Sequence, residues 1–191
     1  MNDQKNIKTK RPLEDYFLIG VLSLLALYVL FLIGKATIIT IPEESRGVMF
    51  KRFDGGLKVE KVYDPGYHFV VPWDNMIIYD ISTQQDSRTI DAMSSDEASV
   101  SIEVKYSFNP IPAEIGHLHN EIGLSYAELI IEPEIGFAVR EIIKNHSRFD
   151  LTDSNKILFE EEIEALSKRS IETKYIELTD LQVISMSRQT E

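Results

Sequence analysis

The sequence predicts an α+β protein that one N-terminal helix holds to a membrane. An uncharged run of 19 residues, Tyr16–Gly34, is long enough to cross a lipid bilayer as a helix. Residues 36–110 show the alternation and turn signals of antiparallel strands. Residues 125–173 show the period of amphipathic helices, and a last strand-like segment follows them. Strands followed by helices and a final strand are typical of an α+β domain.

The composition excludes several classes of protein. The chain has 191 residues, no cysteine and a formal net charge of −11. A chain without cysteine has no disulfide framework, no thiol nucleophile and no cysteine-ligated metal. Nucleic-acid binding relies on clustered Lys and Arg, so this acidic chain is expected to bind no nucleic acid. Its length allows one ordinary domain plus an appendage, and 43% hydrophobic residues suffice for a core.

The apolar run at residues 16–34 is expected to be a transmembrane helix with the lipid bilayer as its partner. As a helix it measures about 28 Å, close to the ~30 Å hydrocarbon core of a bilayer. Two alternatives are a buried core helix and a cleaved signal peptide. No other segment is hydrophobic enough to enclose a core helix. Signal h-regions are shorter, about 7–15 residues, and the small-x-small candidate Gly34-Lys35-Ala36 has a lysine at its centre.

The charges that flank this run predict its orientation. Residues 1–15 hold four basic side chains: Lys5, Lys8, Lys10 and Arg11. Only Lys35 and Arg46 lie within a similar distance on the other side. The positive-inside rule therefore makes residues 1–15 a basic cytoplasmic tail and places the main domain across the membrane. That side is the periplasmic face of a bacterial inner membrane, or the equivalent in an organelle.

Strands and turns alternate in the first part of the domain. The expected strands are 46–53, 57–62, 67–71 and 76–81. Asp54-Gly55-Gly56 predicts a tight hairpin between the first two, because glycine accepts positive φ at little cost. Asp64-Pro65-Gly66 predicts the next turn.

The clearest strand is Ser99–Phe108. Every second residue is large and apolar, and these are Val100, Ile102, Val104, Tyr106 and Phe108. Period two over ten residues indicates one buried face and one solvated face, which fixes the register. The segment Asn109-Pro110-Ile111-Pro112 is expected to end this strand.

Two helices and a strand are expected after residue 112. The first helix spans 125–145, with one apolar face and with Pro133 as a kink or boundary. The second runs from about 153 to 173, capped by Thr152 or Ser154. Its apolar stripe is expected to be Ile157, Leu158, Ile163, Leu166 and Ile171. The segment 176–184 again has a strand pattern.

No cluster of residues predicts catalysis, cofactor binding or a metal site. Ser125, in Gly123-Leu124-Ser125-Tyr126-Ala127, lacks the final glycine of a nucleophile elbow and is better explained as a helix N-cap with Glu128 in a capping box. His117 and His119, with Glu114 and Glu121 as optional ligands, are expected between Pro112 and a helix start as two exposed histidines.

The chain also contains one acidic run and lacks the common motifs for nucleotide binding and zinc catalysis. Glu160, Glu161, Glu162 and Glu164 are expected to form a solvated helix face rather than a cation site. The chain contains no Walker loop, no GxGxxG and no HExxH. We therefore expect no catalytic, cofactor-binding or metal-binding residues.

Three stretches give the chain a resemblance to the prohibitin / band 7 (SPFH) family, in its prohibitin-like subgroup. Pro65-Gly66-Tyr67-His68-Phe69 with Val71-Pro72-Trp73 resembles the hairpin of that family. Residues 95–100 and the strand that ends at Asn109-Pro110 resemble its turn and long strand, although Glu97 stands where the family usually has glycine. Residues 123–133, Val139-Arg140-Glu141 and Phe149 resemble its helical segment.

The resemblance implies a fold, a role and partners. The fold is one transmembrane helix followed by an SPFH domain over residues 36–187. The role is that of a membrane-anchored, non-enzymatic scaffold that self-associates into large rings and organises membrane proteins or regulates a membrane-bound AAA protease. The family normally continues into a long helix that forms coiled coils. Residues 188–191 are expected to be a short tail, and no sustained heptad occurs in the chain.

Two further hypotheses remain open from the sequence. The domain is a membrane-tethered monomer that binds a cell-envelope partner, or it is an enzyme that uses Ser125 or the pair His117 and His119. The missing heptads motivate the first of these two hypotheses. The native mass of the solubilised protein separates the scaffold from the monomeric module.

Overall fold

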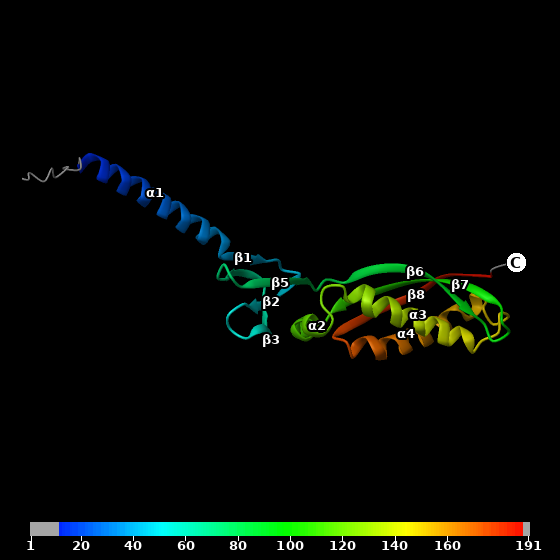
Figure 1. Cartoon of the computed structure of the whole chain (residues 1–191). Helices are drawn as coiled ribbons and strands as arrows, with labels where there is room; N and C mark the ends of the chain where they lie inside the picture. Colours follow the sequence, from blue (N-terminus) through cyan, green and yellow to red (C-terminus); the bar gives the residue numbers. More distant parts are fainter. Residues whose placement is uncertain (1–11, 189–191) are drawn as a thin grey trace, which may run out of the picture.

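The computed structural model describes residues 12–188, so the basic residues Lys5, Lys8, Lys10 and Arg11 of the predicted tail lie outside it, as do 189–191. The elements along the chain are α1 Pro12–Ala36, β1 Ile38–Ile41, β2 Ser45–Lys51, β3 Gly56–Tyr63, β4 Gly66–Phe69, β5 Asn75–Asp80, β6 Gln84–Met93, β7 Ser99–Pro110, α2 Ile115–Glu121, α3 Glu132–Lys144, α4 Lys156–Glu172 and β8 Ile176–Arg188. Figure 1 shows a helical rod that leads into a body of mixed strands and helices. The α+β class with an N-terminal apolar helix is therefore confirmed.

Helix α1 stands apart from the body. Every residue from Tyr16 to Gly34 is exposed, so the body buries no part of this stretch. Its mean hydropathy of 2.7 and its length make it a candidate membrane span. The alternative of a buried core helix is therefore wrong, because a core helix would have neighbours. The one hydroxyl in its middle, that of Ser23, donates to the carbonyl of Gly20 at 2.8 Å.

Residues 37–81 form what we call the proximal subdomain, which is built from two small sheets. Strands β1 and β4 pair antiparallel, and β3, β2 and β5 form a second sheet in that order. The predicted hairpin between β2 and β3 is confirmed, and Gly55 and Gly56 take φ values of 75° and 74° in its turn. The turn after β3 directs β4 away from β3 and onto β1.

Residues 84–188 form the distal subdomain, whose sheet has β7 at its centre. Strands β6 and β8 flank β7, and both pairings are antiparallel. The alternation predicted for β7 is confirmed, since its five large apolar residues are at most 3% exposed. They are Val100, Ile102, Val104, Tyr106 and Phe108.

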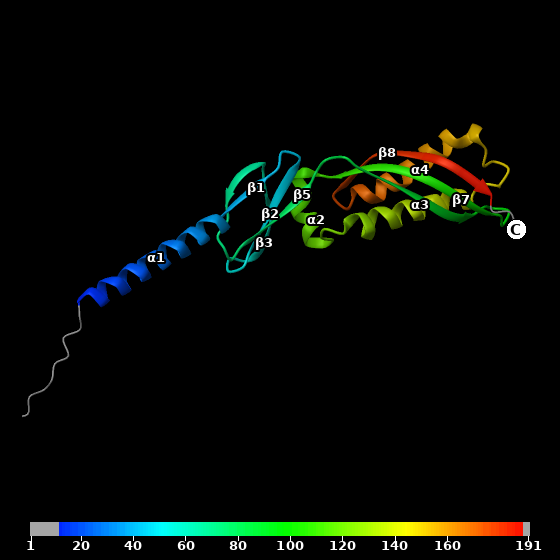
Figure 2. The ribbon, with the colours of Figure 1, turned by 90° about the horizontal axis from the view of Figure 1, so that it is seen from above.

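Helices α3 and α4 lie side by side on one face of this sheet (Figures 1 and 2). The predicted apolar face of α3 is buried, with Ile135, Val139 and Ile143 at 1% exposure or less. Pro133 is indeed a boundary, because it lies in the first turn of α3, directly after a π-helical turn at Ala127–Ile131. The amide of Glu132 bonds to the carbonyl of Ala127 there, one residue further than in an α-helix.

Several local predictions for these helices are wrong. Ile157 and Leu158 of α4 are 68% and 48% exposed, and Phe159 is buried in their place, so the predicted apolar stripe is wrong in the first turn, whereas Ile163 and Ile171 are buried as predicted. The N-cap of α4 is Asn155, neither Thr152 nor Ser154, and no side chain caps it. Ser125 caps no helix either, since the π turn has Tyr126 at its N-cap position without a side-chain bond. A preceding 3-10 turn, Asp153–Asn155, supplies the entry into α4 instead.

Helix α2 joins the two subdomains. It packs on β3 so closely that a Cβ atom at Gly116 would lie 2.0 Å from the carbonyl oxygen of Val59. The main core is continuous across this junction, because Val48 and Tyr79 of the proximal sheets belong to the same buried cluster as the distal sheet. The proximal and distal subdomains therefore share one hydrophobic core and form one folded unit.

Candidate membrane-anchoring site

The end of α1 is bonded directly to the proximal subdomain. The hydroxyl of Thr37 donates to the carbonyl of Ile33 at 2.5 Å, which satisfies one of the last carbonyls of the helix. The carbonyl of Thr37 accepts from the amide of Val70 at 2.8 Å, just beyond β4. Thr37 itself is only 8% exposed. The rod and the β1–β4 pair are therefore held together by backbone, with no free linker between them.

Four exposed aromatic side chains lie on the proximal subdomain, and we call them the aromatic base: Phe53, Tyr67, Phe69 and Trp73. Phe69 pairs with Ile38, which lies two residues beyond the end of α1, and Tyr67 pairs with Thr40. Their exposed fractions are 80% for Phe69 and 82% for Tyr67, which is unusual for large aromatic rings on a protein surface in water.

The other two rings of the base come from neighbouring loops. Trp73 follows Val70 by three residues, and its ring centroid lies 6.4 Å from that of Phe53. The amide of Arg52 donates to the carboxylate of Asp74 at 3.0 Å and ties the two loops together. Aromatic rings with one apolar body are favoured at the boundary between lipid and water. The base thus has the chemistry of a surface that contacts headgroups beside a membrane span.

Charge is distributed unequally between the two subdomains. Residues 36–83 hold five basic and seven acidic side chains, whereas residues 84–191 hold ten basic and 21 acidic ones. An anionic lipid surface repels the distal part far more strongly than the proximal part. Electrostatics therefore favours an orientation in which the base approaches the bilayer and the distal subdomain stands away from it.

The histidine pair is separated rather than brought together. His117 and His119 lie within α2 and are both partly buried, which corrects the expectation that they are exposed and precede a helix. Because residues two apart on a helix point in different directions, the ring of His117 stacks on Tyr175 while Nδ1 of His119 lies 2.7 Å from the hydroxyl of Tyr79. Within residues 12–188 no three His, Asp or Glu side chains gather as metal ligands.

The other candidate residues also serve local roles. Ser125 is exposed, and Glu121 accepts a hydrogen bond from the hydroxyl of Tyr175 at 2.7 Å. Glu160 accepts from the amide of Val183 at 2.8 Å, so it covers the edge of β8 rather than facing only solvent. Glu162 lies 3.4 Å from His146 at the end of α3, on the other side of α4. The acidic run is therefore divided between two directions, which periodicity alone did not indicate.

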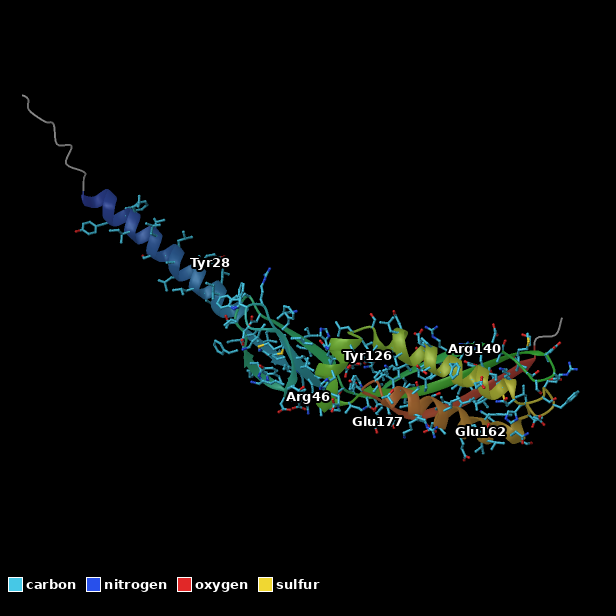
Figure 3. All side chains as sticks on the ribbon, turned by 60° about the horizontal axis from the view of Figure 1, so that its bottom comes forward. Tyr28, Arg46, Tyr126, Arg140, Glu162 and Glu177 are labelled. Carbon is cyan, nitrogen blue, oxygen red and sulfur yellow. The ribbon has the colours of Figure 1, made fainter. Side chains whose placement is uncertain are left out.

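Buried tyrosines form the polar feature that the sequence did not predict. Burial raises the pKa of Tyr79 to about 12, and burial likewise raises the pKa of Tyr106 to about 12. The hydroxyl of Tyr126 accepts a hydrogen bond from the side-chain amide of Gln84 at 2.8 Å. Figure 3 places Tyr126 at the end of the distal subdomain that faces the proximal one. These hydroxyls stay protonated at neutral pH and act as structural hydrogen-bond partners.

Comparison with known proteins agrees with this architecture. Residues 39–187 match the model of the SPFH domain / Band 7 family. The chain is 25% identical to the mitochondrial prohibitin complex protein 1 of Caenorhabditis elegans, over 72% of this chain and 50% of that protein. It is 24% identical to prohibitin-2 of Dictyostelium discoideum, over 85% and 56% respectively. The chain thus spans about half the length of these relatives. It belongs to the SPFH domain / Band 7 family.

Proposed function

We propose that the protein is a membrane-anchored, non-enzymatic scaffold that self-associates and organises or regulates other membrane proteins. The observation that carries this proposal is the fully exposed apolar rod of α1, joined through Thr37 to a base of exposed aromatic rings. Lipid that covers both surfaces would remove their apolar area from water and so stabilise this arrangement.

Two observations support self-association. A similar protein, the mitochondrial prohibitin complex protein 1 of Caenorhabditis elegans, is named as part of a complex. The distal subdomain also carries large exposed apolar side chains away from the base, and these include Phe137, Ile157 and Met93 at 55%, 68% and 60% exposure. Apolar side chains gain about 1.5–3 kcal/mol each when a partner buries them fully.

The proposal includes one class of client and one orientation. Similarity to the prohibitin subgroup favours a membrane-bound AAA protease as the regulated partner. The positive-inside rule favours a cytoplasmic N-terminus and a body on the opposite side of the membrane. In this orientation the scaffold would contact the parts of its client that project from that face.

The native mass of the full chain tests the scaffold. The protein is solubilised in mild detergent and reconstituted in lipid nanodiscs, and its mass is measured across a range of concentrations. We expect a multimer for the full chain, and a fall in mass for the chain without residues 1–35. A monomer at every concentration, with a one-to-one complex in a pull-down, would instead indicate a tethered binding module.

The absence of cysteine makes the orientation testable. Single-cysteine variants Asn6→Cys and Lys105→Cys are treated with a membrane-impermeant maleimide in sealed right-side-out vesicles. We expect Lys105→Cys to react, and Asn6→Cys to react only after the vesicles are opened. The reverse pattern would place the body in the cytoplasm. For the client, cross-linking followed by affinity purification should recover a membrane-bound AAA protease, and its absence would remove that part of the proposal.

A further inference from the structure

The two flanks of the distal subdomain differ in charge. Along the β6 flank lie Met93, Arg140 and Lys144, which we call the basic flank; together with Ser94 and Ser95 they line an open hollow of about 450 Å³. Along the β8 flank lie Ile157, Glu161 and Glu164 of α4, which we call the acidic flank; the one basic neighbour there, Lys156, donates to the carbonyl of Ile184 in β8 at 3.4 Å. Figure 3 labels Arg140 on α3 and Glu162 on the neighbouring helix α4; Glu162 points toward His146 and is not part of the acidic flank.

The helical geometry assigns these residues to the flanks. In α3 the residues Ile135 and Val139 face the sheet, and Glu132 pairs with Arg88 of β6, so Arg140 and Lys144 lie on the side beyond β6. In α4 the bond between Glu160 and the amide of Val183 marks the side toward β8. Glu164 lies about one turn after Glu160 and Ile157 lies about one turn before it, so both residues are on the same side of α4 as Glu160.

The residues on each flank are available for an external partner. Arg140 and Lys144 are exposed, and the guanidinium of Arg140 lies across Gly136, where a Cβ atom would be 3.1 Å from it. Met93 and Ile157 are 60% and 68% exposed. Glu161 is exposed and Glu164 is partly exposed. In the described part of the chain, no salt bridge engages any of these four charged groups.

The two flanks also match in height. The basic residues lie in the last turns of α3 and the acidic residues lie in the first turns of α4. Because the two helices run in opposite directions, both sets lie in the half of the distal subdomain that is remote from α1 (Figure 2). Two copies that stand side by side in one membrane, at the same height and in the same orientation, therefore bring one basic flank against one acidic flank.

We infer that the partner of each flank is the opposite flank of a second copy of this chain, so that copies associate head to tail around the distal subdomain. This inference rests on the proposed self-association and specifies its surfaces. The contact is heterologous, because two different patches meet, and such contacts extend into rings or filaments rather than stopping at a dimer. The contact is made by side chains and not by pairing of edge strands, because Glu160 already accepts the hydrogen bond of the edge amide of Val183.

Charge reversal tests the pairing in the full chain, in the detergent and nanodisc conditions above. Arg140→Glu with Lys144→Glu, and Glu161→Lys with Glu164→Lys, should each reduce the multimer to a monomer. The variant with Glu161→Lys and Glu164→Lys has a smaller net negative charge than the wild type. If repulsion between the acidic chains alone controlled assembly, this variant would assemble better than the wild type. Mixing the two variants should restore co-assembly in a one-to-one ratio, and all four changes in one chain should also restore it. Lys105→Glu, on the open face of the sheet, is the matched control and should assemble normally.

Cysteine cross-linking gives an independent readout that does not depend on affinity. A chain with Lys144→Cys and Ile157→Cys should yield a ladder of disulfide-linked multimers on mild oxidation. Each single variant should yield none, and a mixture of the two should stop at dimers. Far-UV circular dichroism shows whether each variant is folded.

The outcomes separate the inference from the proposal beneath it. A wild-type multimer that survives both reversals and gives no ladder would overturn the flank pairing and leave self-association standing. A wild-type chain that is monomeric in lipid at every concentration would overturn both.

Discussion

The hydroxyl of Tyr79 lies 2.7 Å from Nδ1 of His119 and joins strand β5 to helix α2. Their rings also meet edge to face, with centroids 5.7 Å apart. Burial raises the pKa of Tyr79 to about 12 and lowers the pKa of His119 below 6.5. Both groups are therefore neutral at pH 7 and share one hydrogen bond between the hydroxyl and the ring nitrogen. This contact holds the junction through which the membrane anchor meets the distal subdomain.

Replacing Tyr79 with phenylalanine should destabilise the folded chain by about 1 kcal/mol, since the partly buried ring of His119 loses its hydrogen-bond partner. Thermal unfolding in detergent, followed by circular dichroism, measures the change.

His119 also makes stability depend on pH. Because its folded pKa lies below the unfolded value, its contribution is complete above pH 6.5 and is lost as pH falls through the folded pKa. His119→Gln should flatten the stability profile below pH 6.5, whereas His117→Gln should leave the decline in place. An unchanged profile for His119→Gln would contradict this assignment.

Gly116→Ala should open the junction between β3 and α2. The new methyl group would lie 2.0 Å from the carbonyl oxygen of Val59, and backbone cannot yield as a flexible side chain can. We expect a loss of at least about 2 kcal/mol in unfolding free energy. Denaturant titration in detergent measures it, and Asn120→Ala on the exposed side of α2 serves as the control. Equal stability of Gly116→Ala and the wild type would show that α2 does not rest on β3 in this way.

Glu97→Gly should stabilise the protein by up to about 1 kcal/mol. Glu97 takes a φ of 60° in the turn between β6 and β7, a conformation that costs residues with a side chain about 1–2 kcal/mol. Glycine removes that cost and loses only part of the gain through its more flexible unfolded state. Neighbouring Ala98→Gly should destabilise instead, since its bonds to Ser94 need no positive φ. Differential scanning calorimetry compares the two, and a lower melting temperature for Glu97→Gly would refute the prediction.

Ser167→Ala should also stabilise the chain, by about 1 kcal/mol. Ser167 is 1% exposed, and its hydroxyl has no hydrogen-bond partner in the described structure. Removing a buried, unsatisfied hydroxyl avoids its desolvation cost. Ser94 is the matched contrast, because its buried hydroxyl bonds to Asp96 at 2.6 Å. Ser94→Ala should therefore destabilise, and urea unfolding should give opposite signs for the two variants.

Trp73 offers a direct probe of the aromatic base because it is the only tryptophan in the chain. In vesicles the emission of Trp73 should lie at shorter wavelength than that of a tryptophan-containing peptide in water. Lipids brominated near the headgroup should quench this emission more than lipids brominated at the chain end. Asp74→Lys would alter charge beside the ring without removing it and should keep the quenching order. Quenching by an aqueous quencher alone would place the base in water.

The elements that the sequence predicts well are those in which burial follows one simple period. The apolar run at 16–34 has no charges to interrupt it, and β7 has a large apolar residue at every second position of its predicted length, although Ser107 is also buried. The apolar face of α3 follows for the same reason. The hairpin turn at residues 54–56 was predicted from backbone chemistry, since glycine there takes positive φ.

The elements that the sequence missed have weak or divided patterns. Strand β6 lies at a sheet edge with only Ile90 and Ala92 buried, so it shows little alternation. Helix α2 is short, and its histidines face two different neighbours. The N-caps failed because backbone turns replace side-chain caps at both helix starts. The first turn of α4 holds three consecutive apolar residues, of which Phe159 enters the core while Ile157 and Leu158 stay outside, and periodicity alone does not separate them.

The bond between Thr37 and Val70 makes the body sensitive to bilayer thickness. A membrane thicker or thinner than the apolar length of α1 is accommodated by a change in helix tilt. Because the β1–β4 pair is bonded to the end of α1, the pair rotates when α1 tilts. The distal subdomain is then displaced relative to the membrane. Neighbouring copies would then meet at an angle that depends on the lipids around them, so that membrane composition would set the curvature of the assembled array.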